Sequence, residues 1–182
     1  VLDDVDREAF ERRIAGVCRA HGWILHASCL LDTHHHLVVE TPEPNLGVGL
    51  GRALGAYARR FNERHGQEAH LFGNRFWSRR ITGDADLLRA CVYVVVNPVA
   101  AGLCGHPGEW RWCSYLRTAD GDPAQYAAGE ERLLGMLGDM PGEARRAYAE
   151  IVDAAAEVAR ARRYASGKAL WSALGEVDAI GR

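Results

Sequence analysis

Three consecutive histidines lie in the segment LLDTHHHLVVE, residues 30–40. Side chains alternate between the two faces of a β-strand, so His34 and His36 are expected to point the same way and His35 the opposite way. Two imidazoles with this spacing can hold one divalent cation between them. His-x-His pairs also occur by chance and then only form hydrogen bonds, so the spacing alone leaves both interpretations open.

A tyrosine and an asparagine stand four residues apart in DADLLRACVYVVVNPVAAGL, residues 84–103. In a helix, Tyr93 and Asn97 would share one face. A phenol with a pKa of ~10 is a poor nucleophile until it or its target is activated. A metal ion that polarises a phosphodiester gives such help, and Asn97 offers it a neutral oxygen ligand. The alternative is that Tyr93 is a core aromatic residue, and spacing alone favours this alternative.

The sequence around the histidines predicts a β-hairpin between two helices. Residues 3–22 have helical apolar spacing, with Asp3 or Asp4 as the N-cap and Gly22 at the end. Two apolar runs, residues 23–31 and 36–41, follow with few residues between them, which favours an antiparallel pair.

A second helix is expected at residues 46–64, after a possible cap at Asn45. An apolar stripe runs along it, formed by Leu50, Leu54, Tyr57 and Phe61. We therefore interpret Tyr57 as a packing residue.

The second half of the chain predicts one strand and three helices. NRFWSRRI, residues 74–81, is expected to be a strand. The run VYVVV has strand propensity, but the Asp cap and the apolar spacing favour a helix that ends near Asn97, because Pro98 restricts the residue before it. Residues 143–164 predict an amphipathic helix, with Tyr148, Ile151, Val152 and Ala155 facing inward. A shorter helix is expected around Trp171 and Leu174.

This order of elements predicts an α+β fold. The chain starts at Val1 rather than Met, which suggests that upstream sequence has been cut away. One strand added there would give βαββαβ, a ferredoxin-like antiparallel sheet with helices packed on it. A composition shift at TADGDPAQ predicts a linker between a catalytic domain, residues 1–118, and a helical C-terminal extension, residues 123–182.

Three segments, in this order, carry a resemblance to a known family: LDTHHHLVVETPEPNL, YARRFNERHGQEAHLFGNRF and CVYVVVNPVAAGL. They resemble the single-tyrosine HUH transposases, and among these most closely the REP-associated tyrosine transposases and their insertion-sequence relatives. The resemblance extends from the chain start to about residues 112–115. It departs from the family pattern at His35, where a hydrophobic residue is usual, and in the missing first strand.

The resemblance implies a function and a set of site residues. It places Mg²⁺ or Mn²⁺ on His34 and His36, with Asn97 as a third ligand. It makes Tyr93 the nucleophile that attacks single-stranded DNA, so that a 5′-phosphotyrosine link and a free 3′-hydroxyl form and can later be rejoined. A second hypothesis is a domesticated or truncated protein that binds DNA hairpins without turnover. A structural zinc site is a weaker one, since no cysteine–histidine cluster has closed-site spacing.

A basic segment lies inside a chain with a formal net charge of −2. Guanidinium groups suit phosphate recognition, and exposed aromatic rings such as Phe76 and Trp77 can stack on unpaired bases. The predicted contacts to single-stranded or hairpin DNA are Arg52, Arg59, Arg60, Arg75, Trp77, Arg79 and Arg80. The alternative for each arginine is an ordinary solvated position.

The remaining sequence features concern location and assembly. The five cysteines form no C-x-x-C motif, so we expect buried free thiols in a reducing cytoplasm. The chain has no signal peptide and no long apolar span, so no membrane partner is expected. A monomer and a homodimer both fit the sequence.

Overall fold

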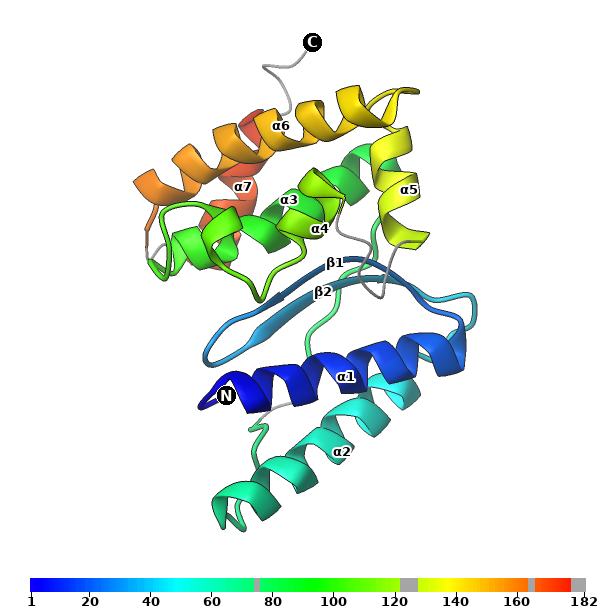
Figure 1. The fold of residues 1–182 in the computed structure, drawn as a ribbon, viewed down its shortest axis with the longest axis vertical. Coiled ribbons are helices and arrows are strands. Elements are labelled where there is room, and N and C mark those ends of the chain that lie inside the picture. Colours follow the sequence, from blue (N-terminus) through cyan, green and yellow to red (C-terminus); the bar gives the residue numbers. More distant parts are fainter. Residues whose placement is uncertain (74–75, 122–127, 164–165, 178–182) are drawn as a thin grey trace. The chain divides into compact units, whose positions relative to one another are not determined.

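The fold is seen in a computed structural model that describes residues 1–73, 76–121, 128–163 and 166–177 (Figure 1). The chain divides into two compact units, each described here by itself. The first unit contains residues 1–24 and 40–80, and the second contains residues 25–39 and 81–182.

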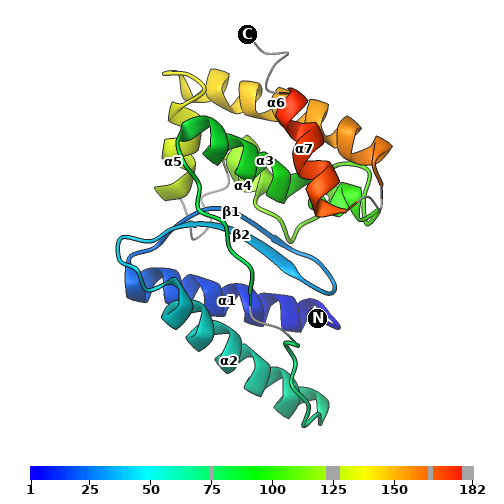
Figure 2. The same ribbon diagram turned by 180° about the vertical axis from the view of Figure 1, so that it is seen from behind.

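Two helices build the first unit: α1, Asp4–His21, and α2, Leu46–His65. They lie side by side in both views (Figures 1 and 2). The predicted first cap is Asp3, whose side chain accepts a hydrogen bond from the Asp6 amide, and Gly22 ends α1 in the left-handed conformation. Asn45 precedes α2 but makes no side-chain cap, because its Oδ1 accepts a hydrogen bond from the Trp23 indole at 2.7 Å.

Aromatic packing and an ion cluster join α1 to α2. Tyr57 is buried with its ring edge-on to Phe10, 5.3 Å between centroids, so the packing role expected for it is confirmed. Asp6 is only 3% exposed and accepts hydrogen bonds from Arg64 Nη1 at 2.6 Å and from His65 Nε2 at 3.0 Å. A buried carboxylate needs such partners to offset its lost hydration.

The hairpin β1, Ile24–Leu30, with β2, His35–Glu40, is the antiparallel pair that the sequence predicts. The Leu31 amide donates to the His34 carbonyl at 2.9 Å across the turn. Cys29 and Val38 belong to the buried core of the second unit. The α+β class, an antiparallel sheet with helices packed on it, is thereby confirmed.

Helix α3, Asp84–Ala100, carries the predicted Tyr93 and Asn97. The prediction that it ends near Asn97 is wrong, since Pro98 lies inside the helix. Proline removes one backbone donor and usually breaks a helix. Here Val95, Val96 and Val99 are fully or almost fully buried. The free energy gained by burying these apolar side chains in a continuous helix outweighs the loss of one backbone hydrogen bond.

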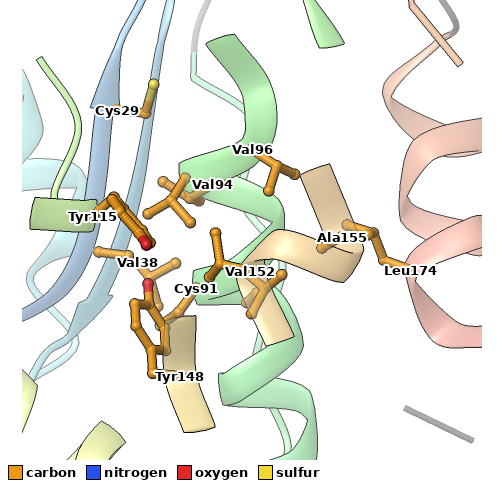
Figure 3. Close-up of a cluster of buried hydrophobic side chains, with 14 of the residues drawn as sticks. Cys29, Val38, Cys91, Val94, Val96, Tyr115, Tyr148, Val152, Ala155 and Leu174 are labelled. Carbon is orange, nitrogen blue, oxygen red and sulfur yellow. The ribbon is translucent and has the colours of Figure 1, made fainter. Parts of the chain in front are cut away.

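The other helices of the second unit are η1, Pro107–Glu109; α4, Tyr115–Asp120; α5, Ala128–Gly135; α6, Pro141–Ala161; and α7, Gly167–Val177. Figure 3 shows part of the core, where side chains of the hairpin, α3, α4, α6 and α7 pack together. The helices expected at 143–164 and around Trp171 are present, and Tyr148, Val152 and Ala155 are buried as predicted. Ile151 is only partly buried, and α5 was not predicted.

The strand predicted at residues 74–81 is not found in its described part, residues 76–81. Trp77 is 82% exposed, and Arg79 and Arg80 are exposed too, so most of this segment is not buried against a sheet. The described sheet therefore has two strands, and Cys113 adds a single antiparallel bridge to Cys29. Local alternation alone does not make a strand without a pairing partner.

Helices on both sides of the predicted linker share one core. Tyr115 of α4 stacks on Tyr148 of α6 with 6.2 Å between ring centroids. Residues 122–127 lie outside the described residues, and the domain division at 118–123 stays a prediction. All five cysteines are free thiols, and Cys104 and Cys113 are half-buried rather than fully buried. Within the described part of the chain, no helix is both long and apolar enough to span a bilayer.

Candidate active site

His34 and His36 lie together at the start of β2, on the same side, as strand alternation predicts. Their ring centroids are 5.0 Å apart and the rings meet edge to face. His34 is exposed, and its Nδ1 lies 3.1 Å from Thr33 Oγ1. His36 is half-buried, and its Nε2 is buried without a hydrogen-bond partner among the residues that the structure describes. A buried imidazole nitrogen that lacks a partner costs free energy unless a ligand satisfies it.

Tyr93 meets this pair from helix α3. Its ring is edge-on to His36 with 5.6 Å between centroids. A histidine from the hairpin and a tyrosine from a helix more than 50 residues later thus form one continuous side-chain cluster. Sequence spacing could place His34 beside His36, but only the tertiary fold places Tyr93 beside them.

Asn97 lies one helical turn beyond Tyr93 and is 8% exposed. Its side-chain Nδ2 donates to the Tyr93 backbone carbonyl at 2.5 Å. This bond fixes the amide with its nitrogen toward the helix, which leaves Oδ1 as an acceptor for another group. The arrangement is compatible with Asn97 as an oxygen ligand.

The protonation states of the cluster suit ligand binding. Burial lowers the pKa of His34, and it lowers the pKa of His36 to about 4, with the charges of His34 and His35 adding to the effect. Burial also lowers the pKa of His35 to about 4. These imidazoles are therefore neutral at pH 7, the form that binds metals. Burial raises the pKa of Tyr93, and a hydrogen bond from the Asn97 side chain opposes that rise.

Helix α7 also contacts Tyr93. The Trp171 ring meets Tyr93 at 5.5 Å between centroids, and the Arg89 guanidinium carbon lies 4.2 Å from the centre of the Trp171 ring. A Cβ atom at Gly167 would come within 2.7 Å of the Tyr93 hydroxyl oxygen. Sequence reasoning missed Arg89, Trp171 and Gly167, although Arg89 is four residues before Tyr93, a spacing that could have revealed it.

The predicted DNA-contacting residues belong to the first unit. Arg52, Arg59 and Arg60 are exposed on α2, and Trp77, Arg79 and Arg80 are exposed in the segment that follows it. Phe76 is half-buried, and Arg75 lies outside the described residues. The structure therefore joins the two histidines and Tyr93 in one cluster of the second unit, which also contains Asn97, and places the described basic residues in the other unit.

The donor set fits a divalent cation. His34 and His36 offer two neutral imidazoles, one with a nitrogen that has no partner among the described residues, and Asn97 of α3 carries an amide whose nitrogen is already bonded. Within the described ranges, no group of three or more His, Cys, Asp or Glu side chains is placed to hold a metal ion. A site of two imidazoles and one amide would leave positions for water or substrate, as catalytic metal sites require.

Comparison of the chain with protein-family models, with curated proteins and with solved structures found no match.

Proposed function

We propose that this protein nicks and rejoins single-stranded DNA through Tyr93, as a transposase that acts on hairpin-bearing DNA. The observation that carries the proposal is the contact between the His34–His36 pair and the Tyr93 ring. A potential nucleophile is thereby adjacent to a potential metal-binding pair, which is the combination that phosphodiester transesterification needs.

In the proposed reaction the Tyr93 oxygen attacks phosphorus and its proton leaves to solvent. The bond between phosphorus and the 3′-oxygen breaks, and that oxygen takes up a proton to become a 3′-hydroxyl. The products are a 5′-phosphotyrosine link and a free 3′ end, so no nucleotide cofactor is consumed. A 3′-hydroxyl can reverse the step and join strands, because the covalent link conserves the phosphodiester energy.

The residues proposed to hold Mg²⁺ or Mn²⁺ are His34, His36 and Asn97. When bound, such an ion would neutralise charge on the scissile phosphate. Imidazole ligands favour Mn²⁺ over Mg²⁺ on softness, and Mg²⁺ is suggested by the family resemblance alone.

The exposed basic residues of the first unit support the choice of DNA as substrate. Arg52, Arg59 and Arg60 on α2 could follow a phosphate backbone. The Trp77 ring is 82% exposed, and a side chain of this size in water is suited to stack on an unpaired base.

A second candidate function is hairpin binding without catalysis. It is favoured by the surroundings of Tyr93, because burial raises its pKa and Gly167 of α7 adjoins its hydroxyl. Such a tyrosine is less easily ionised than one in water. The two candidates share DNA binding and differ only in covalent chemistry.

A covalent-capture experiment separates the candidates. The protein is incubated with a pool of end-labelled single strands that carry different hairpins, with Mn²⁺ or with EDTA, and is then denatured. The transposase function predicts a labelled protein band that survives denaturing electrophoresis, requires Mn²⁺ and retains the DNA downstream of the cut. Retention of hairpins on a native gel without any covalent band across the pool would support the binding protein instead.

A further inference from the structure

Arg89 lies one helical turn before Tyr93 on the same face of α3. Its guanidinium carbon is 4.2 Å from the centre of the Trp171 ring, and Trp171 in turn packs edge-on against Tyr93. The flat face of an arginine on a tryptophan is a stable arrangement that fixes the direction of the side chain. Trp171 therefore links the positive charge of Arg89 to the ring of the proposed nucleophile.

Arg89 has no acidic partner within the part of the chain that the structure describes. Among the described residues, its buried Nε has no hydrogen-bond partner and neither of its terminal nitrogens donates a hydrogen bond. A half-buried guanidinium in this state gives up hydration without a protein partner in return. The five N–H groups of arginine match two oxygens of a phosphate in a fork, so an anion would satisfy the unused donors.

We propose that Arg89, held against Trp171, is a phosphate-binding residue that contacts a phosphodiester of single-stranded DNA beside Tyr93. The inference rests on the proposed function and adds a site to it, where Trp171 of α7 contacts Tyr93. The guanidinium would orient the phosphate for attack and offset the negative charge that grows on its oxygens. The competing explanation is that Arg89 only stabilises the packing of α7 on α3 through its contact with Trp171.

Binding is tested without catalysis, in the full chain with Tyr93→Phe, on an oligo-deoxythymidine strand of roughly 12 nucleotides. Adding Arg89→Gln should weaken binding about tenfold at low salt, and it should reduce the slope of log affinity against log salt by about 0.7, the value for one phosphate contact on a single strand. Arg89→Lys keeps the positive charge. Compared with Arg89→Gln, it should restore the dependence of affinity on salt and part of the affinity for the strand. Arg146→Gln, which removes an exposed arginine from α6, is the matched control.

Catalysis is tested in the protein with Tyr93 intact. Arg89→Gln should slow the formation of the covalent adduct by roughly 10²-fold relative to Arg146→Gln, measured with DNA at saturation. Arg89→Gln could instead lower the melting temperature and still match Arg146→Gln in salt slope and in the rate of adduct formation. In that case Arg89 only stabilises the packing of α7 on α3, and our inference is wrong. If no variant, nor the unaltered protein, forms an adduct while the salt slope still depends on Arg89, the phosphate site stands and the nicking function fails.

Discussion

The Nε2 atom of His36 is buried and has no hydrogen-bond partner among the described residues. His34 and His36 face each other, and strand alternation predicts that His35 points to the opposite side. Titration calorimetry with Mn²⁺ should therefore show more than about tenfold weaker binding in His34→Ala and in His36→Ala. His35→Phe should change the affinity much less. Equal losses in all three variants would reject the pair as the ligand set.

Gly167 is the residue that leaves room for the Tyr93 hydroxyl. An alanine there would place Cβ 2.7 Å from that oxygen, so one of the two elements must shift. We expect Gly167→Ala to lower the free energy of unfolding by about 1 kcal/mol, the low end for overpacking. In a Tyr93→Phe background the same change should be neutral or stabilising, because the clash is gone and alanine favours the helix.

A double-mutant cycle with urea unfolding measures this coupling between Gly167 and Tyr93. Additive effects of the two substitutions would show that α7 does not pack on the Tyr93 hydroxyl.

At the scale of elements, the carboxylates of the first unit hold α1 to α2. The Arg64 side chain lowers the pKa of Asp3 from 3.8 to about 2. Burial opposes ionisation of Asp6, but hydrogen bonds from His65 and Arg64 outweigh it, and its pKa is also lowered. A carboxyl group whose folded pKa is depressed stabilises the fold above its unfolded pKa, and this contribution is lost as the pH falls toward the folded value.

The free energy of unfolding should therefore drop between about pH 4 and pH 2. Replacing Asp3 and Asp6 by asparagine should flatten that drop, and Asp6→Asn alone should cost about 1–3 kcal/mol at neutral pH because Arg64 and His65 lose a charged acceptor. Urea unfolding at several pH values checks both. An unchanged acid profile in the double variant would mean that the cluster does not stabilise the α1–α2 pair.

Much of the element order could be predicted from the sequence, because caps and apolar periodicity are local signals. Asp3 and Gly22 mark both ends of α1, and the short connection between residues 31 and 35 fixes the hairpin. The path of α3 through Pro98 depends on burial in a core that no local window reveals. The segment after residue 75 does not form a strand, because a strand needs the edge of another strand to pair with and a local window does not reveal one.

Part of the candidate site could likewise be predicted from local sequence spacing, and part could not. Strand alternation predicted that His34 and His36 lie together, and helical spacing predicted a shared face for Tyr93 and Asn97. The Tyr93–His36 contact links segments far apart in sequence, and the Trp171 contact comes from a helix further on. Such contacts arise from tertiary packing, so spacing could not give them.

At the scale of the whole molecule, the proposed chemistry and the proposed DNA contacts belong to different compact units. Affinity for single-stranded or hairpin DNA should fall steeply with salt, because counterions are released when arginines bind phosphates. Replacing Arg59 and Arg60 by glutamine should reduce the salt slope by about 1.4, the value for two single-strand contacts.

The control for this change removes two other exposed arginines of the first unit, Arg13 and Arg19 on α1, and so matches it in charge. If the two double variants lower the slope equally, only net charge counts, and α2 is not a specific DNA-binding surface. A preference for plain duplex over single strands would also contradict the account.

The residue that becomes covalently linked to DNA decides whether Tyr93 is the nucleophile. In the presence of Mn²⁺ and a cleavable hairpin strand, the account predicts a DNA adduct whose tryptic peptide carries the nucleotide on Tyr93. Tyr93→Phe should abolish the adduct and leave DNA binding nearly unchanged, since one hydroxyl is removed. Tyr57→Phe, a change in the buried core between α1 and α2, should still form it. An adduct that persists in Tyr93→Phe and disappears in Tyr57→Phe would contradict the account.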